Sequence, residues 1–287
     1  MSQTAYTMKA KHLLLAVLCF VFVQTESKAQ LGFSHEIGVI TGPVAFQSDF
    51  GERFDFDTNA GNVGFGVGLV HYLNFAYRAD CNCYSRDTYW NDHFKIRNEI
   101  DYHETNLDNF GPEAEDNDFG GLRLRNHKGK ARVWEIGTQI EYFPISIRDF
   151  SAGAYKFAPY ASLGIHFVSF NPEAITLLRD DRDIFGLVDN PFTADVTDSG
   201  PAIIPGFNQG DGINGTGVDD SVGETFAITW SAGVRYKLGP LSDLLIDARW
   251  HFYNSNWVDG LNPDPRPSNR ANDWIFWLNV GYIYYIE

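Results

Sequence analysis

The residues with the most obvious chemistry are charged side chains that recur at alternate positions within otherwise apolar segments. Alternate positions of an extended chain share one face, so these charges would meet if their faces enclosed a common interior. Charge buried there is costly unless it is paired. We therefore expect a paired charge network in a narrow lumen, formed by Glu36, Lys95, Arg97, Glu99, Asp101, Glu135, Glu141, Arg235, Lys237, Asp247, Arg249 and His251. The alternative for the same residues is a path for protons or small ions.

Two histidines stand near residues that could share in acid–base catalysis. His251 precedes Ser255 by four positions, and Glu104 directly follows His103. A histidine beside a serine or a carboxylate is an arrangement that hydrolysis can use. The chain has no Gly-x-Ser-x-Gly nucleophile elbow, however. We expect no catalytic residues and no enzymatic activity; a lipid- or peptide-modifying hydrolase is the alternative.

A Cys-x-Cys pair, Cys81 and Cys83, lies between His71 and His93. Thiols at this spacing can form a tight disulfide, stay free, or bind a soft metal together with His93. Two thiols fall short of the four ligands of a structural zinc site. We expect a local disulfide or free thiols within a long turn, and no metal or cofactor.

The chain is strongly acidic, with 37 Asp and Glu against 22 Lys and Arg and a net charge of −15. Phosphate binding needs a basic surface, so we expect no nucleic-acid partner. Many of the acids fall in residues 171–223, where Asp180, Asp181 and Asp183 could bind calcium. Because EF-hand spacing is absent, a solvated surface loop is the prediction for this segment.

Alternation with period two predicts the elements that would position these groups. Between Thr225 and Leu238, Phe226, Ile228 and Trp230 alternate with small or charged residues, and similar segments recur along the chain up to Glu287. Successive residues of a β-strand point to opposite faces, so the pattern predicts strands throughout.

The first residues predict export rather than structure. A cationic start at Lys9 and Lys11, an apolar run over Leu13–Val23 and a small residue at Ala29 are the order of a signal peptide. We expect residues 1–29 to be cleaved and residues 30–287 to form one domain. No later run approaches the roughly 18 apolar residues of a transmembrane helix.

The connections decide between two β architectures. Apolar faces would form the core of a soluble exported β-protein, but would contact lipid in a membrane barrel. The longer connections, about 43–60, 104–131, 171–223 and 255–272, alternate with a shorter set, 76–92, 144–156 and 239–242. That asymmetry and the 15% aromatic content favour an all-β, antiparallel transmembrane up-and-down β-barrel of about eight strands. We expect it in the outer membrane, with both termini in the periplasm.

Particular segments resemble a known family. Phe33–Val39 (FSHEIGV) resembles the opening of small outer-membrane barrels of Bacteroidota, including PorG-like proteins of the type IX secretion system. Tyr77–Tyr84 (YRADCNCY) and Asn91–Lys95 (NDHFK) resemble a narrower flavobacterial branch. This resemblance covers nearly the whole mature chain and implies a barrel associated with the periplasmic ring of that secretion machine, without catalytic residues. The chain departs from PorG-like proteins in its Cys-x-Cys turn and its longer third outer loop, and it lacks the terminal Phe that is common in other outer-membrane barrels.

The polar residues are concentrated in connections, where binding sites are most often found. We therefore expect a structural or adaptor component of the cell envelope, of a secretion or motility assembly. Its partners would be outer-membrane lipid and periplasmic or outer-membrane proteins. The alternative to this function is a narrow channel for ions or small solutes.

Overall fold

The computed structural model describes residues 34–48, 50, 56–75, 89–117, 121, 125, 127–176, 221–260 and 272–286. The strands are β1 (Ser34–Gln47), β2 (Val63–Asn74), β3 (Phe94–Asp108), β4 (His127–Tyr142), β5 (Phe157–Phe170), β6 (Glu173–Thr176), β7 (Gly223–Gly239), β8 (Ser242–Tyr253) and β9 (Trp274–Ile286). Short helices lie between them: α2 (Phe56–Gly61), α3 (Tyr89–His93), α4 (Pro112–Glu115) and α6 (Ile147–Ser151). In these ranges no helix has the length and apolar character needed to span a membrane.

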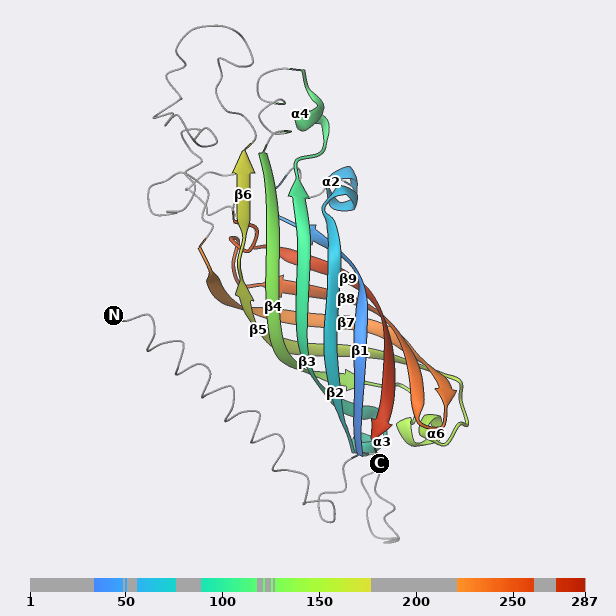
Figure 1. The fold of residues 1–287 in the computed structure, drawn as a ribbon. Helices are drawn as coiled ribbons and strands as arrows, with labels where there is room; N and C mark the ends of the chain where they lie inside the picture. Colours follow the sequence, from blue (N-terminus) through green and yellow to red (C-terminus); the bar gives the residue numbers. More distant parts are fainter. Residues whose placement is uncertain are drawn as a thin grey trace, which may run out of the picture.

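The strands close into a barrel (Figure 1). Neighbours pair antiparallel in the order β3-β2-β1-β9-β8-β7-β5-β4, and pairing of β3 with β4 completes the circle. The short β6 pairs with the first residues of β4 and continues the line of β5 after a two-residue break. The predicted antiparallel barrel of eight strands is thus confirmed, and closure leaves no long strand edge unpaired among the described strands.

The barrel has two unlike ends. At one, which we call the terminus end, β1 begins, β9 finishes, and Gly239 and Ser242 flank a tight turn. The opposite loop end carries the connections 48–62, 109–126, 177–222 and 254–273 between the strands. The predicted alternation of longer and shorter connections is present only in part. The connection 75–93 at the terminus end has 19 residues, more than the 15 of 48–62 and the 18 of 109–126 at the loop end.

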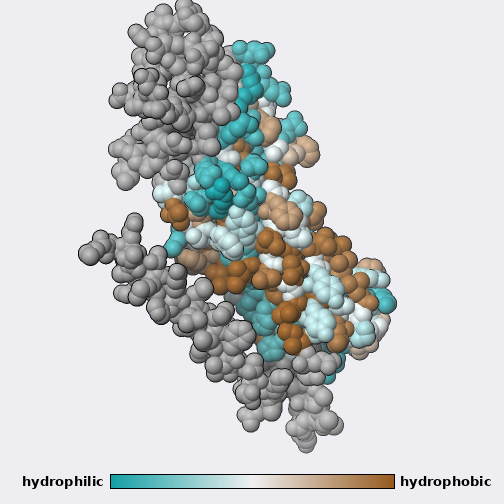
Figure 2. Space-filling model, viewed as in Figure 1, coloured by the Kyte–Doolittle hydropathy of each residue, from teal (hydrophilic) through white to brown (hydrophobic). Residues whose placement is uncertain are grey.

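The outer face of the barrel is apolar. Leu69, Leu163 and Trp134 are each about 60% exposed, and Figure 2 shows hydrophobic residues gathered over the body of the barrel. Aromatic pairs mark the limits of this band on β3 and β4: Phe94 with Tyr142, and Tyr102 with Trp134. Eight residues separate these pairs, which is about 26 Å of strand and, at a tilt of about 40°, about 20 Å of depth.

That depth is close to the apolar band of outer-membrane barrels, about 25 Å. A closed barrel pairs all of its backbone groups, as hydrocarbon requires. The apolar exterior contacts lipid, and the charged side chains lie inside, away from it. The chain is therefore a transmembrane β-barrel of the outer-membrane type, and the alternative of a soluble exported β-protein is wrong.

One row of polar side chains interrupts the lipid-facing band. His71, Asn98 and Thr138 are direct cross-strand neighbours on β2, β3 and β4. His35 Nδ1 lies 3.0 Å from His71 Nε2, and an open groove of about 980 Å³ passes over the row. Asn98 and Thr138 are midway between the two aromatic pairs, at the depth where lipid offers no hydrogen-bond partner.

Strands β3 and β4 continue beyond the apolar band at the loop end. Their outer faces there carry ion pairs: Lys130 to Glu104 at 2.5 Å, Lys128 to Asp108 at 2.7 Å, and Arg132 to Glu173 of β6 at 2.5 Å. The expected connection 104–131 is consequently too long, since the strands reach Asp108 and resume at His127. The sequence hides this extension because a strand in water loses the apolar face that the alternation pattern requires.

Candidate functional site

The structure places all twelve residues of the expected network inside the barrel. They occupy inward positions of β1, β3, β4, β7 and β8, and none of them is more than 5% exposed. The alternation of these strands leaves them no other face, because the outward positions are apolar. The lumen is the candidate site, and its contents fall into three clusters from the terminus end upward.

The first cluster surrounds Glu36 near the terminus end. Its two carboxylate oxygens accept hydrogen bonds from Lys95 and Arg235, each at 2.5 Å. The Arg235 guanidinium also lies over the Tyr72 ring at 4.1 Å and reaches Glu141 at 3.4 Å. These contacts connect β1, β3, β4 and β7 across the interior, which fixes opposite walls relative to one another.

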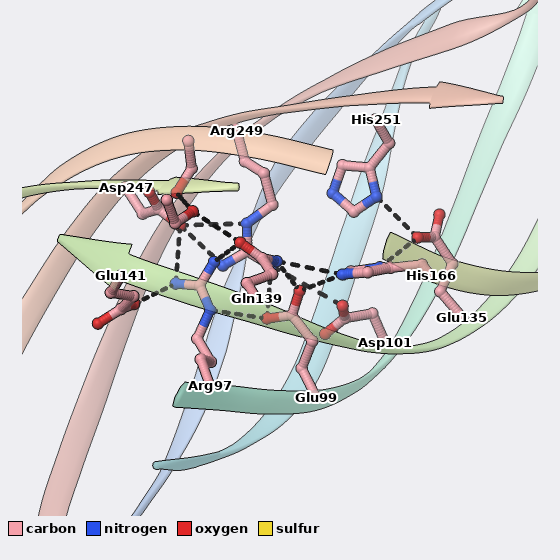
Figure 3. Close-up of polar contacts among 12 residues, drawn as sticks. Arg97, Glu99, Asp101, Glu135, Gln139, Glu141, His166, Asp247, Arg249 and His251 are labelled. Atoms are coloured by element: carbon pink, nitrogen blue, oxygen red, sulfur yellow. Dashed lines mark hydrogen bonds and ion pairs between the residues drawn. The ribbon is translucent and has the colours of Figure 1, made fainter. Parts of the chain in front are cut away.

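The second cluster centres on two arginines (Figure 3). Arg97 contacts Glu141 at 2.9 Å, Glu99 at 3.2 Å and Asp247 at 3.5 Å. Arg249 reaches Asp247 at 2.7 Å and Glu99 at 2.9 Å. Both guanidinium groups therefore share the same carboxylates, as paired buried charge requires.

The third cluster is built around Glu135, toward the loop end. His166 Nδ1 and His251 Nδ1 lie 2.8 and 2.7 Å from its Oε2, and Tyr253 donates a hydrogen bond to Oε1 at 2.8 Å. Figure 3 shows both imidazoles directed at this carboxylate. His103 Nε2 is 3.9 Å from Oε1.

Apolar side chains close the lumen above and below these clusters. Phe143, Ile147 and Phe150 are buried at the terminus end, where α6 folds under the barrel. At the loop end the buried Phe46 and Phe50 belong to the same apolar core as Phe170, Val258 and Ile275. Buried side chains of the described residues thus occupy the interior from one end to the other.

The residues considered for catalysis do not come together. His103 points into the lumen, whereas Glu104 points outward and bonds Tyr102 and Lys130. Ser255 accepts a hydrogen bond from the backbone N–H of Trp257, and His251 contacts Glu135. Cys81, Cys83, the acids at 180–183 and residues 1–29 lie outside the described residues.

Sequence reasoning missed several members of the site. His103, His166, Gln139 and Asp243 are all buried in the lumen, although the expected network omitted them. Alternation could have found each one: Asp243 is four residues before Asp247 on β8, and Gln139 lies between Gly137 and Glu141 on β4. The inward residues that are apolar, such as Ile40, Val44 and Trp277, could not be recognised as lumen residues, because apolar residues are also expected on the lipid-facing side.

No protein-family model matches the chain, and no curated protein matches it. Among solved structures, the chain is similar to the Neisserial surface protein A (NspA), with 11% identity, a TM-score of 0.41, and coverage of 88% of this chain and 97% of that one. It is also similar to a major outer membrane protein from Thermus thermophilus, with 11% identity, a TM-score of 0.40, and coverage of 88% and 99%. A third is Ail, the attachment invasion locus protein of Yersinia pestis, in complex with the heparin analogue sucrose octasulfate, with 11% identity, a TM-score of 0.37, and coverage of 88% and 100%. The barrel assignment itself rests on the strand closure and the exterior described above.

Proposed function

We propose that this barrel is a non-enzymatic, non-conducting scaffold that acts as a structural or adaptor component of the outer membrane. The observation that carries the proposal is the filled lumen: three ion-pair clusters lie between apolar plugs at both ends. A pore needs a continuous aqueous path, and an eight-stranded barrel has room for little besides its own side chains. What remains available for binding is the surface at the two ends.

Both ends present ordered surfaces beyond the membrane. At the terminus end, Arg148 of α6 pairs with Asp92 of α3 at 3.1 Å, and Tyr89 and Trp90 are about half exposed. At the loop end, β3, β4 and β6 extend beyond the apolar band and carry the outward-facing ion pairs of Lys128, Lys130 and Arg132. A membrane-anchored adaptor needs such rigid platforms, because preorganised surfaces bind at a lower entropic cost.

The proposed partners are periplasmic or outer-membrane proteins of a secretion-type assembly, in line with the PorG-like resemblance. In this proposal both termini face the periplasm, so α3 and α6 form the periplasmic platform. Outer-membrane lipid surrounds the band between the aromatic pairs.

Conductance across a planar bilayer tests the first half of the proposal. The wild-type barrel should give no steady conductance. The uncharged variants Arg235→Gln and Glu135→Gln should likewise give none. Steady ion flow through the wild type, altered by these substitutions, would establish the channel alternative instead.

Site-specific cross-linking in cells tests the second half. A photo-reactive side chain at Trp90 should yield a defined protein adduct that Arg148→Glu weakens, since that change places two acidic groups together. The matched control is the same probe at Leu163, which faces lipid and should give no protein adduct. Equal yields at both positions, or none at Trp90, would refute the adaptor role of this platform.

A further inference from the structure

The histidine cluster contains buried nitrogen atoms that no part of the described chain satisfies. Neither ring nitrogen of His103 has a hydrogen-bond partner there, and His251 Nε2 also lacks one. His103 is 2% exposed and His251 is fully buried. Buried polar atoms are nearly always paired with protein, water or an ion, so His103, which has no partner at either ring nitrogen among the described residues, calls for a ligand.

The geometry around Glu135 suits a metal ion. One ligand atom each from His103, Glu135 and His251 lies within 4.8 Å of the others. Glu135 oxygens are 2.7 Å from His251 Nδ1 and 3.9 Å from His103 Nε2. Ligand atoms around a tetrahedral ion with bonds of about 2.0–2.1 Å are about 3.3 Å apart, between these two separations. An ion that replaces the hydrogen bond between His251 Nδ1 and Glu135, together with small side-chain rotations, would therefore complete the site.

The charge inside the barrel also leaves room for a cation. The inward strand positions carry seven buried carboxylates: Glu36, Glu99, Asp101, Glu135, Glu141, Asp243 and Asp247. They face five buried cations: Lys95, Arg97, Arg235, Lys237 and Arg249. His166 adds a sixth positive charge, because both of its ring nitrogens contact carboxylates, at 2.8 Å from Glu135 and 2.9 Å from Glu99. Seven minus six leaves one negative charge, which favours a bound cation.

We propose that His103, Glu135 and His251 bind one divalent first-row transition-metal ion, with Zn²⁺ as the reference, inside the barrel. Imidazole and carboxylate ligands are the set that zinc and its neighbours accept. His103 and Glu135 come from the adjacent β3 and β4, whereas β8 lies on another part of the wall, not paired with either. The ion would join the two sides of the lumen.

Neighbouring groups support Glu135 as a ligand. His166 Nδ1 and the Tyr253 hydroxyl both contact this carboxylate, and such outer contacts orient metal ligands. A second group, Glu99, Asp101 and His166, has similar spacing. It suits a metal less well, because Glu99 already pairs with Arg97 and Arg249.

The test measures metal retention by the full mature chain in detergent. The reference protein carries His35→Gln, His71→Gln, Cys81→Ser and Cys83→Ser, which removes the exterior imidazole pair and both thiols. Because the site is buried, the chain is unfolded in urea with chelator, refolded with Co²⁺ or Zn²⁺, and desalted. Elemental analysis should give about one metal ion per barrel, and Co²⁺ should show the visible bands of a site without thiolate.

Variants then assign the ligands. His103→Gln and His251→Gln should each weaken binding at least tenfold, whereas His93→Gln should not, since that imidazole bonds the Phe143 carbonyl away from the cluster. Gel mobility without heating checks that each variant folds. If a ligand variant does not fold, X-ray absorption of the zinc-loaded reference protein should count two imidazole ligands. The proposal would be overturned if the folded reference protein retained no metal. It would also be overturned if all three variants retained metal equally, or if the bound zinc had no imidazole ligands.

Discussion

Removing the charge of Glu36 should destabilise the barrel more than any surface substitution. This carboxylate is fully buried and accepts hydrogen bonds from Lys95 and Arg235 at 2.5 Å each. In Glu36→Gln, Arg235 keeps Glu141 at 3.4 Å, but Lys95 loses the one ion-pair partner that it has among the described residues. Breaking a buried pair while leaving one charge behind costs about 3–5 kcal/mol. That is a large part of an ordinary folding free energy of about 5–15 kcal/mol.

The double variant Glu36→Gln/Lys95→Met separates the cost of unpaired charge from the loss of a contact. Removing both charges should recover part of the stability, because replacing a buried pair with uncharged groups is often nearly neutral. The surface control is Glu104→Gln, whose partner Lys130 is about 30% exposed, and its effect should stay within about 1 kcal/mol.

Urea unfolding in detergent or lipid vesicles, followed by tryptophan fluorescence, gives the free energies. The reasoning would be refuted by a Glu36→Gln cost no larger than that of Glu104→Gln. It would also be refuted if the double variant lost as much free energy of unfolding as Glu36→Gln and Lys95→Met lose when their separate losses are added.

Three further outcomes follow from the packing of particular positions. Gly137→Ala should lower the unfolding free energy by about 1–3 kcal/mol, because the new Cβ would overlap the His166 ring; an unchanged urea midpoint would contradict this. Asn98→Leu should raise stability in vesicles by about 1–3 kcal/mol, since its amide faces lipid at mid-depth and its contact with His71 Nδ1 is long, at 3.5 Å. A loss of stability would show that this contact outweighs the cost of placing the amide in lipid. Glu173→Gln removes the ion pair that ties β6 to Arg132, which keeps Glu104 at 3.5 Å, and should speed amide exchange in β6 without changing global unfolding, because few contacts hold this short strand. Equal exchange rates in mass spectrometry would count against that last expectation.

The sequence was sufficient to predict the strands and their inward faces, because period-two alternation depends on local geometry alone. It indicated that Glu36, Arg97 and Arg249 would share an interior. It did not indicate which charges meet, since contacts across a lumen depend on strand stagger and tilt. His251 and Glu135 illustrate this: they lie on β8 and β4, which do not pair, and their contact depends on how these strands face each other rather than on spacing.

Two other features were beyond the reach of the pattern. The apolar plugs use residues such as Phe50 and Ile147 that lie outside regular strand alternation. The extended wall of β3 and β4 has charged residues outside and small or apolar ones inside, which reverses the rule that identified the membrane segments. In both cases the surroundings of the segment differ from those of the membrane-spanning strands, so the alternation pattern does not identify the segment.

The seam between β1 and β9 constrains how the barrel can fold. His35 pairs with Ile286, so closure of the barrel joins the two extremes of the described chain. Contacts so distant in sequence form slowly, because the intervening chain must be ordered first. Until β9 arrives, β1 and β8 each expose a strand edge that hydrocarbon cannot accommodate. We therefore expect insertion to be concerted with closure, and we expect the net charge of −15 to help keep the unfolded chain soluble until then through self-repulsion.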